Sequence, residues 1–222
     1  MRFGWASAGS ARRWIGRTQR GKDDETDEWK ARYQCCSLAR WRNSMITRCH
    51  QKGDAASEAV YSDCERYRYR LTRIWQSSGP RAVFIMLNPS TATELQNDPT
   101  VERCERRARV LGFGSFSVAN IFAFRATDPR NMRAATDPVG PQNDAAILEL
   151  AAASDRIICA WGTHGAHLRR GDEIEIKLRS LNRPLFHLGL TKAGAPTHPL
   201  YISYERQPVL WAKSDAPPAA TA

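Results

Sequence analysis

The spacing of apolar residues changes several times along the middle of the chain, and each change separates two predicted elements. Residues 67–75 alternate polar and apolar side chains, which predicts an edge strand with one exposed face. Residues 81–87 form an almost continuous apolar run, which is typical of a strand buried on both faces. Residues 99–111 predict a helix, because Asp98 suits the N-cap, a proline occupies the first helical position and Gly112 suits the stop.

Strands and helices continue to alternate toward the carboxyl terminus. Further strands are predicted over 116–124, 156–161 and 184–190, helices over 143–153 and 172–181, and a short closing strand or loop over 198–204. Strands separated by helices require crossover connections. The order therefore predicts an α/β fold, a three-layer α/β/α sandwich with a mostly parallel central sheet.

The two ends of the chain differ from this regular part. Residues 1–44 mix Gly, Ser, Arg and Trp without any helical or strand period, and Met45 opens a more regular sequence. We expect residues 1–44 to be a disordered extension or the product of a misassigned start. Residues 45–213 are expected to form a single α/β domain, and residues 214–222 a disordered, low-complexity tail.

Composition narrows the class of protein. Hydrophobic residues make up 42% of the chain and charged residues 25%, as in ordinary globular proteins. The formal net charge is +10, half of it within residues 1–44, so the body permits a polyanionic partner without requiring one. No apolar run is long enough to cross a membrane, and no membrane partner is expected. The scattered cysteines argue against a metal centre and a disulfide scaffold, and favour a cytoplasmic protein without cofactors.

Candidate chemistry gathers where the predicted strands end. Asn88 follows the first buried strand, Asn120 lies in the next one, His164 follows the third and His198 comes after the fourth. Carboxyl ends of parallel strands meet at one edge of an open sheet, where ligands bind, so these side chains are expected to converge. Side-chain amides can pair with a nucleobase or orient a water, and a histidine can donate a hydrogen bond to developing negative charge.

Each of these residues also has a purely structural interpretation. Asn88 can end a strand in an Asn-Pro turn, Asn120 can satisfy a buried backbone group, and His198 can form a loop corner. His164 and His167 can be surface residues of a Gly-flanked loop, and their spacing is a weak metal signal. The chain lacks a phosphate loop, a dinucleotide fingerprint and a nucleophile elbow, so nucleoside-triphosphatase, dinucleotide and serine-hydrolase functions are poorly supported.

Several short motifs resemble a bacterial and phage family known as domain of unknown function 1643. The similar segments are Tyr61-Ser-Asp-Cys64, Met86-Leu-Asn-Pro-Ser-Thr-Ala92, Asn97-Asp-Pro-Thr100, Asn120-Ile-Phe122, Ala160-Trp-Gly162 and His198-Pro-Leu-Tyr201. The resemblance covers residues 58–212 and implies no function by itself.

The order of the motifs also resembles the uracil-DNA glycosylase superfamily, whose members have a central parallel sheet in an α/β/α sandwich. The resemblance implies a DNA N-glycosylase, a hydrolase of DNA repair or base modification, that flips its target base out of the strand. Asn88 is then the residue that orients the attacking water, and His198 stabilises the departing base. The base-binding residues implied are Asn120, Leu87 and Trp161.

Basic residues near the predicted strand ends complete this hypothesis. Arg125, Arg169, Arg170 and Lys192 are candidates to hold the phosphates of single- or double-stranded DNA, and a solvated basic surface is the alternative. Two other functions stay open. One is a non-catalytic module that binds nucleic acid or a modified base, and the other is an enzyme that acts on free nucleotides.

Overall fold

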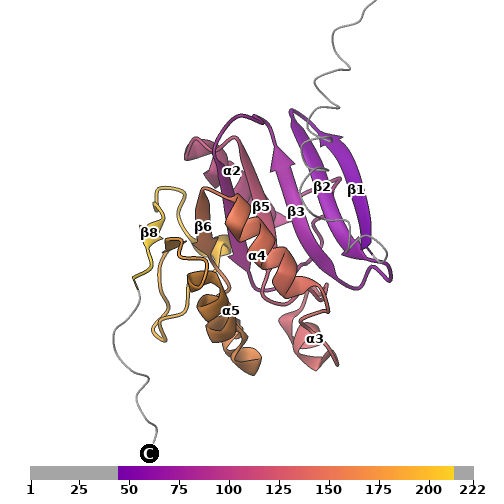
Figure 1. Ribbon diagram of the computed structural model, residues 1–222, viewed down its shortest axis with the longest axis vertical. Coiled ribbons are helices and arrows are strands. Elements are labelled where there is room, and N and C mark those ends of the chain that lie inside the picture. Colours follow the sequence, from indigo (N-terminus) through magenta and orange to yellow (C-terminus); the bar gives the residue numbers. More distant parts are fainter. Residues whose placement is uncertain (1–44, 213–222) are drawn as a thin grey trace, which may run out of the picture. The chain divides into compact units, whose positions relative to one another are not determined.

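A computed structural model describes residues 45–212 of the chain (Figure 1). The predicted extension 1–44 and the predicted tail 214–222 lie outside the described residues. The described part falls within one compact unit. It contains a single β-sheet with helices, which confirms the α/β class.

Within the described range, eight strands form one mixed sheet in the order β1-β2-β3-β5-β4-β6-β7-β8. The strands are β1 (Met45–Lys52), β2 (Ala55–Ser62), β3 (Arg68–Ile74), β4 (Arg81–Met86), β5 (Ser115–Asn120), β6 (Arg156–Cys159), β7 (Leu185–His187) and β8 (Val209–Leu210). The helices are α2 (Pro99–Val110), α3 (Pro129–Ala134), α4 (Asn143–Ala153) and α5 (Arg170–Arg179), with 3₁₀ turns η1 (Thr163–Arg169) and η2 (Pro199–Tyr201).

The prediction of a mostly parallel sheet is wrong. Parallel pairing is confined to the centre, where β4 pairs with β5 and β6, and β6 pairs with β7. The other neighbouring pairs are antiparallel. The physical reason is the β1–β2 hairpin, which the sequence pattern did not reveal. Only Gly53 and Asp54 separate these strands, and so short a connection forces antiparallel pairing.

The same hairpin makes β3 an interior strand rather than the predicted edge strand. β3 pairs with β2 on one side and with β5 on the other. Its polar residues Arg68 and Arg73 looked like solvent-facing positions, yet their exposed fractions are 1% and 0%. The alternation of polar and apolar residues is therefore real, but both faces of this strand are covered.

Helices pack on both faces of the central strands (Figure 1). Alternate residues of β4 enter different cores, as the period of a strand requires. Val83 and Ile85 join the cluster that contains residues of α3, α4 and α5. Phe84 and Met86 join the cluster that contains residues of α2. Burial on both faces explains why this strand reads as a continuous apolar run.

Helix α2 begins and ends as the sequence predicts. Asp98 is the N-cap, and its side chain accepts a hydrogen bond of 2.8 Å from the backbone nitrogen of Val101. Pro99 occupies the first turn, and Gly112 beyond the end has a φ of +77°. The predicted helix over 143–153 also coincides with α4.

The end of β4 is a topological switch point. The chain leaves β4 toward α2 on one face, and leaves the neighbouring β5 and β6 toward helices on the other face. Connections that diverge in this way open a crevice beyond the carboxyl ends of the strands, and ligands of open α/β sheets bind there. The functional site is therefore best sought at the residues after Met86.

Candidate functional site

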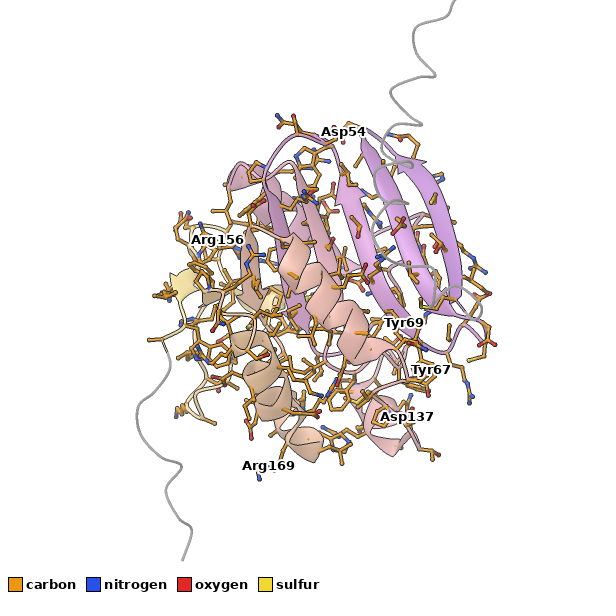
Figure 2. All side chains as sticks on the ribbon, in the orientation of Figure 1. Asp54, Tyr67, Tyr69, Asp137, Arg156 and Arg169 are labelled. Atoms are coloured by element: carbon orange, nitrogen blue, oxygen red, sulfur yellow. The ribbon has the colours of Figure 1, made fainter. Side chains whose placement is uncertain are left out.

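The parallel register brings the ends of three strands together. Met86 of β4 is aligned with Asn120 of β5, and Ile85 is aligned with Cys159 of β6. In Figure 2, Arg156 marks the start of β6 and Arg169 marks the chain beyond its carboxyl end. The segments that follow the three strands thus share one edge of the sheet.

Asn88 is held in one orientation at this edge. Its Nδ2 donates hydrogen bonds to the carbonyl of Pro89 at 3.0 Å and to that of Ala126 at 2.7 Å. The backbone nitrogen of Ala126 donates in turn to the carbonyl of Pro89 at 2.9 Å. The amide nitrogen is therefore committed to backbone groups. Oδ1 accepts no hydrogen bond from the described residues and stays available to a water or ligand.

Asn120 has an exposed fraction of 1%, and neither Oδ1 nor Nδ2 has a hydrogen-bond partner among the described residues. Strand alternation places its side chain on the α2 face, together with Phe116 and Val118. A buried amide without partners costs about 1–3 kcal/mol for each unmet group. This is the polar side chain at the edge with the greatest unmet demand for a ligand.

His198 lies against the end of β6. A Cβ atom on Gly162 would come within 3.5 Å of the His198 Cβ, so the two backbones pack closely. Nδ1 of His198 accepts a hydrogen bond of 3.4 Å from the backbone nitrogen of Leu200. The proton of a neutral imidazole then resides on Nε2, which becomes a donor.

Burial keeps the His198 ring neutral near pH 7. Burial lowers the pKa of His198, His164 lowers it further, and Asp98 opposes both effects. Asp98 is therefore both the N-cap of α2 and a negative charge near His198, a second role that the sequence did not reveal. The same carboxylate acts on the buried Arg68. Burial lowers the pKa of Arg68 to about 10, and the charge of Asp98 partly opposes this shift.

Leu87 and Trp161 lie in the core on the α4–α5 face. Their exposed fractions are 6% and 3%. The Trp161 indole packs directly against Gly165 and Gly171. A Cβ atom on either glycine would come within 2.2 Å or 2.8 Å of the ring, respectively. It also contacts Trp211, with ring centroids 5.7 Å apart. Both side chains are packed within this core.

The four predicted phosphate-binding residues differ in accessibility. Arg169 and Lys192 are exposed, and Arg169 lies 3.6 Å from Asp172. Arg125 is half-buried and has no ion-pair partner among the described residues. Arg170 has an exposed fraction of 2%, and its Nε donates to the carbonyl of Ile121 at 2.8 Å.

Arg170 also forms ion pairs with Asp144 and Glu173, so its guanidinium is used within the fold. His164 is exposed, and its Nδ1 lies 3.0 Å from an Arg133 nitrogen. The ring of His167 instead faces Phe122 at 5.6 Å. In the described residues, no cluster of three or more His, Cys, Asp or Glu side chains has the arrangement to hold a metal.

Sequence reasoning predicted Arg125 as a phosphate-binding residue but missed the other four residues that line a shallow, open cavity at this edge. The cavity has a volume of about 400 Å³ and is lined by Ser90, Thr91, Arg125, Ala126 and Thr127. Asn120 and His198 are not among its walls, although Asn88 bonds to both loops that form it. For these four residues, the only signal in the sequence was their position in or beside the Asn-Pro and Arg-Ala-Thr-Asp-Pro motifs.

Two buried arginines of β3, also missed, hold the loop after β4 over the sheet. Arg68 Nη1 donates to the carbonyl of Ala92 at 2.6 Å, and Arg73 Nη2 donates to that of Thr93 at 2.6 Å. These two hydrogen bonds fix the loop after β4, which carries Asn88 and Asp98, so buried arginines of β3 help to shape the candidate site.

Comparisons with known proteins give a family and no further relatives. A family model described as "Protein of unknown function (DUF1643)" matches residues 68–200. No curated protein and no solved structure gives a significant match. Among the helices of the described range, none combines the length and apolar character needed to span a membrane.

Proposed function

The chain belongs to the DUF1643 family of proteins of unknown function, and we propose that it is a DNA N-glycosylase acting at the carboxyl edge of its sheet. The observation that carries the proposal is the Asn120 amide, which is buried with both polar atoms unpartnered. A side-chain amide offers one acceptor and two donors, which suits the polar edge of a flipped base.

Asn88 orients the attacking water in this proposal. Its Nδ2 is bound to two carbonyls, so Oδ1 has a defined direction in which to accept a hydrogen bond from water. The water adds to the sugar carbon while the bond from that carbon to the base nitrogen breaks. The electron pair of the broken bond stays on the base, and the water hydrogens end on the new sugar hydroxyl and on the base.

His198 stabilises the departing base. A neutral ring with its proton on Nε2 donates a hydrogen bond to the negative charge that develops on the base. Burial lowers the pKa of His198, so the ring is in this form at neutral pH. The resemblance to the uracil-DNA glycosylase superfamily assigns the same roles to these residues. The proposed location is the cytoplasm, where the thiols stay reduced.

A second candidate function is a non-catalytic module that binds a modified base. One observation favours it: Asn88 is uncharged and has no carboxylate hydrogen-bonded to it, so it cannot take a proton from water. In such a binding module Asn120 would still contact the base, but Asn88 would have no catalytic role.

The test incubates the full chain with single-stranded and duplex oligonucleotides that carry a panel of modified bases, followed by alkali cleavage of abasic sites. We expect strand cleavage at one base type, and a rate reduced about 100-fold or more by Asn88→Ala and by His198→Ala. His50→Ala, on the exposed strand β1, is the matched control and should leave the rate unchanged.

The outcomes separate the candidates. Salt-sensitive DNA binding without cleavage on any substrate would replace the glycosylase by the binding module. Cleavage that survives both site variants would move the active centre elsewhere. Absence of both cleavage and DNA binding would redirect the proposal to free nucleotides.

A further inference from the structure

The cavity at the carboxyl edge has the composition of an anion site. Two loops form it, one after β4 and one in the segment that follows β5. Its lining offers three hydroxyls and one guanidinium, from Ser90, Thr91, Thr127 and Arg125, and contains no carboxylate. We infer that this cavity binds a phosphate group of a nucleotide or of a nucleic-acid strand. The inference deepens the proposed function, on which its choice of nucleotide ligands rests.

The two walls are joined before any ligand arrives. Asn88 Nδ2 donates to the carbonyl of Ala126, and the Ala126 nitrogen donates to the carbonyl of Pro89. The backbone nitrogen of Arg125 donates to the carbonyl of Arg66 at 2.9 Å, which ties the second wall to the β2–β3 turn. A site with fixed walls loses little conformational entropy on binding.

Arg125 is a cation without a counterion. Its Nη1 donates to the carbonyl of Glu65 at 3.1 Å, and its guanidinium lies 5.1 Å from the centroid of the Tyr61 ring. These contacts orient the group and leave its charge uncompensated, since no carboxylate of the described residues forms an ion pair with it. Its Nε is buried and has no hydrogen-bond partner.

Neighbouring charges reinforce the demand for an anion. The fully buried Arg68 lies close enough for Arg125 to lower its pKa further. Glu65, the acid nearest in sequence on the turn, pairs with Arg48 at 2.5 Å. Glu94 accepts a hydrogen bond from the hydroxyl of Tyr61, on the ring that Arg125 contacts. Because both acids are engaged elsewhere, the positive charge of Arg125 is left uncompensated, and a phosphate in the cavity would offset it.

The hydroxyls supply the remaining donors. None of Ser90, Thr91 and Thr127 uses its side-chain oxygen in a hydrogen bond with another described residue, so each is available to a phosphate oxygen. The cavity, of about 400 Å³, is shallow and open to solvent, so a sugar can extend from a phosphate held in it. Asn88 donates a hydrogen bond to the carbonyl of Ala126, which lines this space. The phosphate would therefore belong to the nucleotide at the proposed site or to the strand that carries it.

The experiment measures binding to the full chain by calorimetry, with inorganic phosphate, thymidine, thymidine 5′-monophosphate and a short single-stranded oligonucleotide as probes. We expect inorganic phosphate to bind, and both phosphate-bearing nucleotide probes to bind about tenfold or more tightly than thymidine. Arg125→Gln should weaken phosphate binding about tenfold or more. Arg130→Gln, on an arginine already paired with Asp128 at 2.6 Å, is the matched control and should leave it unchanged.

Thr127→Val provides a second variant, because it removes a hydroxyl from an exposed position without disturbing the core. It should weaken phosphate binding while the melting temperature stays the same. A monophosphate that binds as tightly as the oligonucleotide would identify a free nucleotide as the source of the phosphate. A salt dependence for the oligonucleotide whose slope falls by about 1 in Arg125→Gln would identify a strand.

Two results would overturn the inference. One is phosphate-bearing probes that bind no better than thymidine, and the other is an equal loss in Arg125→Gln and Arg130→Gln. These results are independent of catalysis. Phosphate binding without base release would reject the glycosylase function and support the phosphate site. Base release without phosphate binding at Arg125 would support the glycosylase function and reject the phosphate site.

Discussion

Burial acts on Asn120 and His198 in different ways, because one side chain is always neutral and the other can lose its charge. Asn120 keeps its polar atoms whatever the pH, so its unmet hydrogen bonds persist until a ligand or water supplies them. His198 responds by remaining neutral, since burial lowers its pKa. The chemistry proposed for the site follows from these two responses.

The titration of His198 should be visible in the stability of the fold. Its pKa is lower in the folded chain than in the unfolded chain, so the unfolded state binds more protons between the two values. Stability should therefore rise with pH through this window and fall as the solution is acidified. We expect His198→Asn to flatten the dependence, as measured by urea unfolding at pH 5, 6 and 7.

His187 provides a comparison for this measurement. Burial lowers its pKa as well, and Arg206 adds to the effect, so His187→Asn should flatten the profile in the same direction. A profile that keeps its full slope after both substitutions would show that other groups control the acid limb.

At the level of elements, Arg107 of α2 holds the segment that follows His198. Its guanidinium donates at 3.0–3.4 Å to the carbonyls of Ile202, Ser203, Tyr204 and Arg206, and its exposed fraction is 1%. No carboxylate of the described residues pairs with it. The helix therefore binds an irregular segment through backbone carbonyls, which a loop sequence does not reveal.

Replacing Arg107 by Met should destabilise the fold by about 2–4 kcal/mol, because the carbonyls it binds lose their donor. The matched control is Arg106→Met on the same helix, where the side chain is 65% exposed and, among the described residues, forms an ion pair only with Glu102. We expect that change to cost no more than about 0.5 kcal/mol. Urea unfolding measures both, and equal costs would contradict the role given to Arg107.

Another element carries backbone strain. Leu168 and Arg169, consecutive residues at the end of η1, both have a φ of 53°. Residues other than glycine rarely adopt such a positive backbone angle. Such residues cost about 1–3 kcal/mol each and persist only where neighbours enforce them. Here the neighbours are the buried Arg170 and the Trp161 indole packed against Gly165. The turn is thus shaped by anchors on both sides.

At the scale of the whole molecule, the sheet joins a central parallel part to antiparallel margins. The central strands β4, β5 and β6 are buried almost throughout. The edge strand β1 exposes most of its residues, and β8 consists of two exposed residues. The site is therefore built on strands that are almost fully packed, which suits groups that must hold a fixed geometry.

This difference predicts the order of amide hydrogen exchange. Amides of β4, β5 and β6 should exchange slowest, near the rate set by global unfolding, whereas β1 and β8 should exchange through local openings. Hydrogen exchange followed by mass spectrometry of peptides measures this order. Uniform protection across all strands would contradict it, and faster exchange in β4 than in β1 would invert it.

Properties that depend on a few neighbouring residues could be predicted from the sequence. Asp98 with the proline after it determined the start of α2, and the apolar run after Arg81 determined the buried strand β4. The same reasoning located Asn88 and Asn120 where two strands end, and those ends are indeed adjacent. Their roles stay predictions, since position alone does not establish chemistry.

Properties that depend on contacts between distant residues were decided only by the tertiary structure. Burial of Arg68, Arg73 and Arg170 could not be read from the chain, because their partners are backbone groups and acids far away in sequence. The direction of pairing at the margins depended on an unrecognised hairpin. The cavity beside Arg125 exists because two loops meet only once β4 and β5 are paired. Local patterns specify elements, whereas packing determines which polar groups remain without partners.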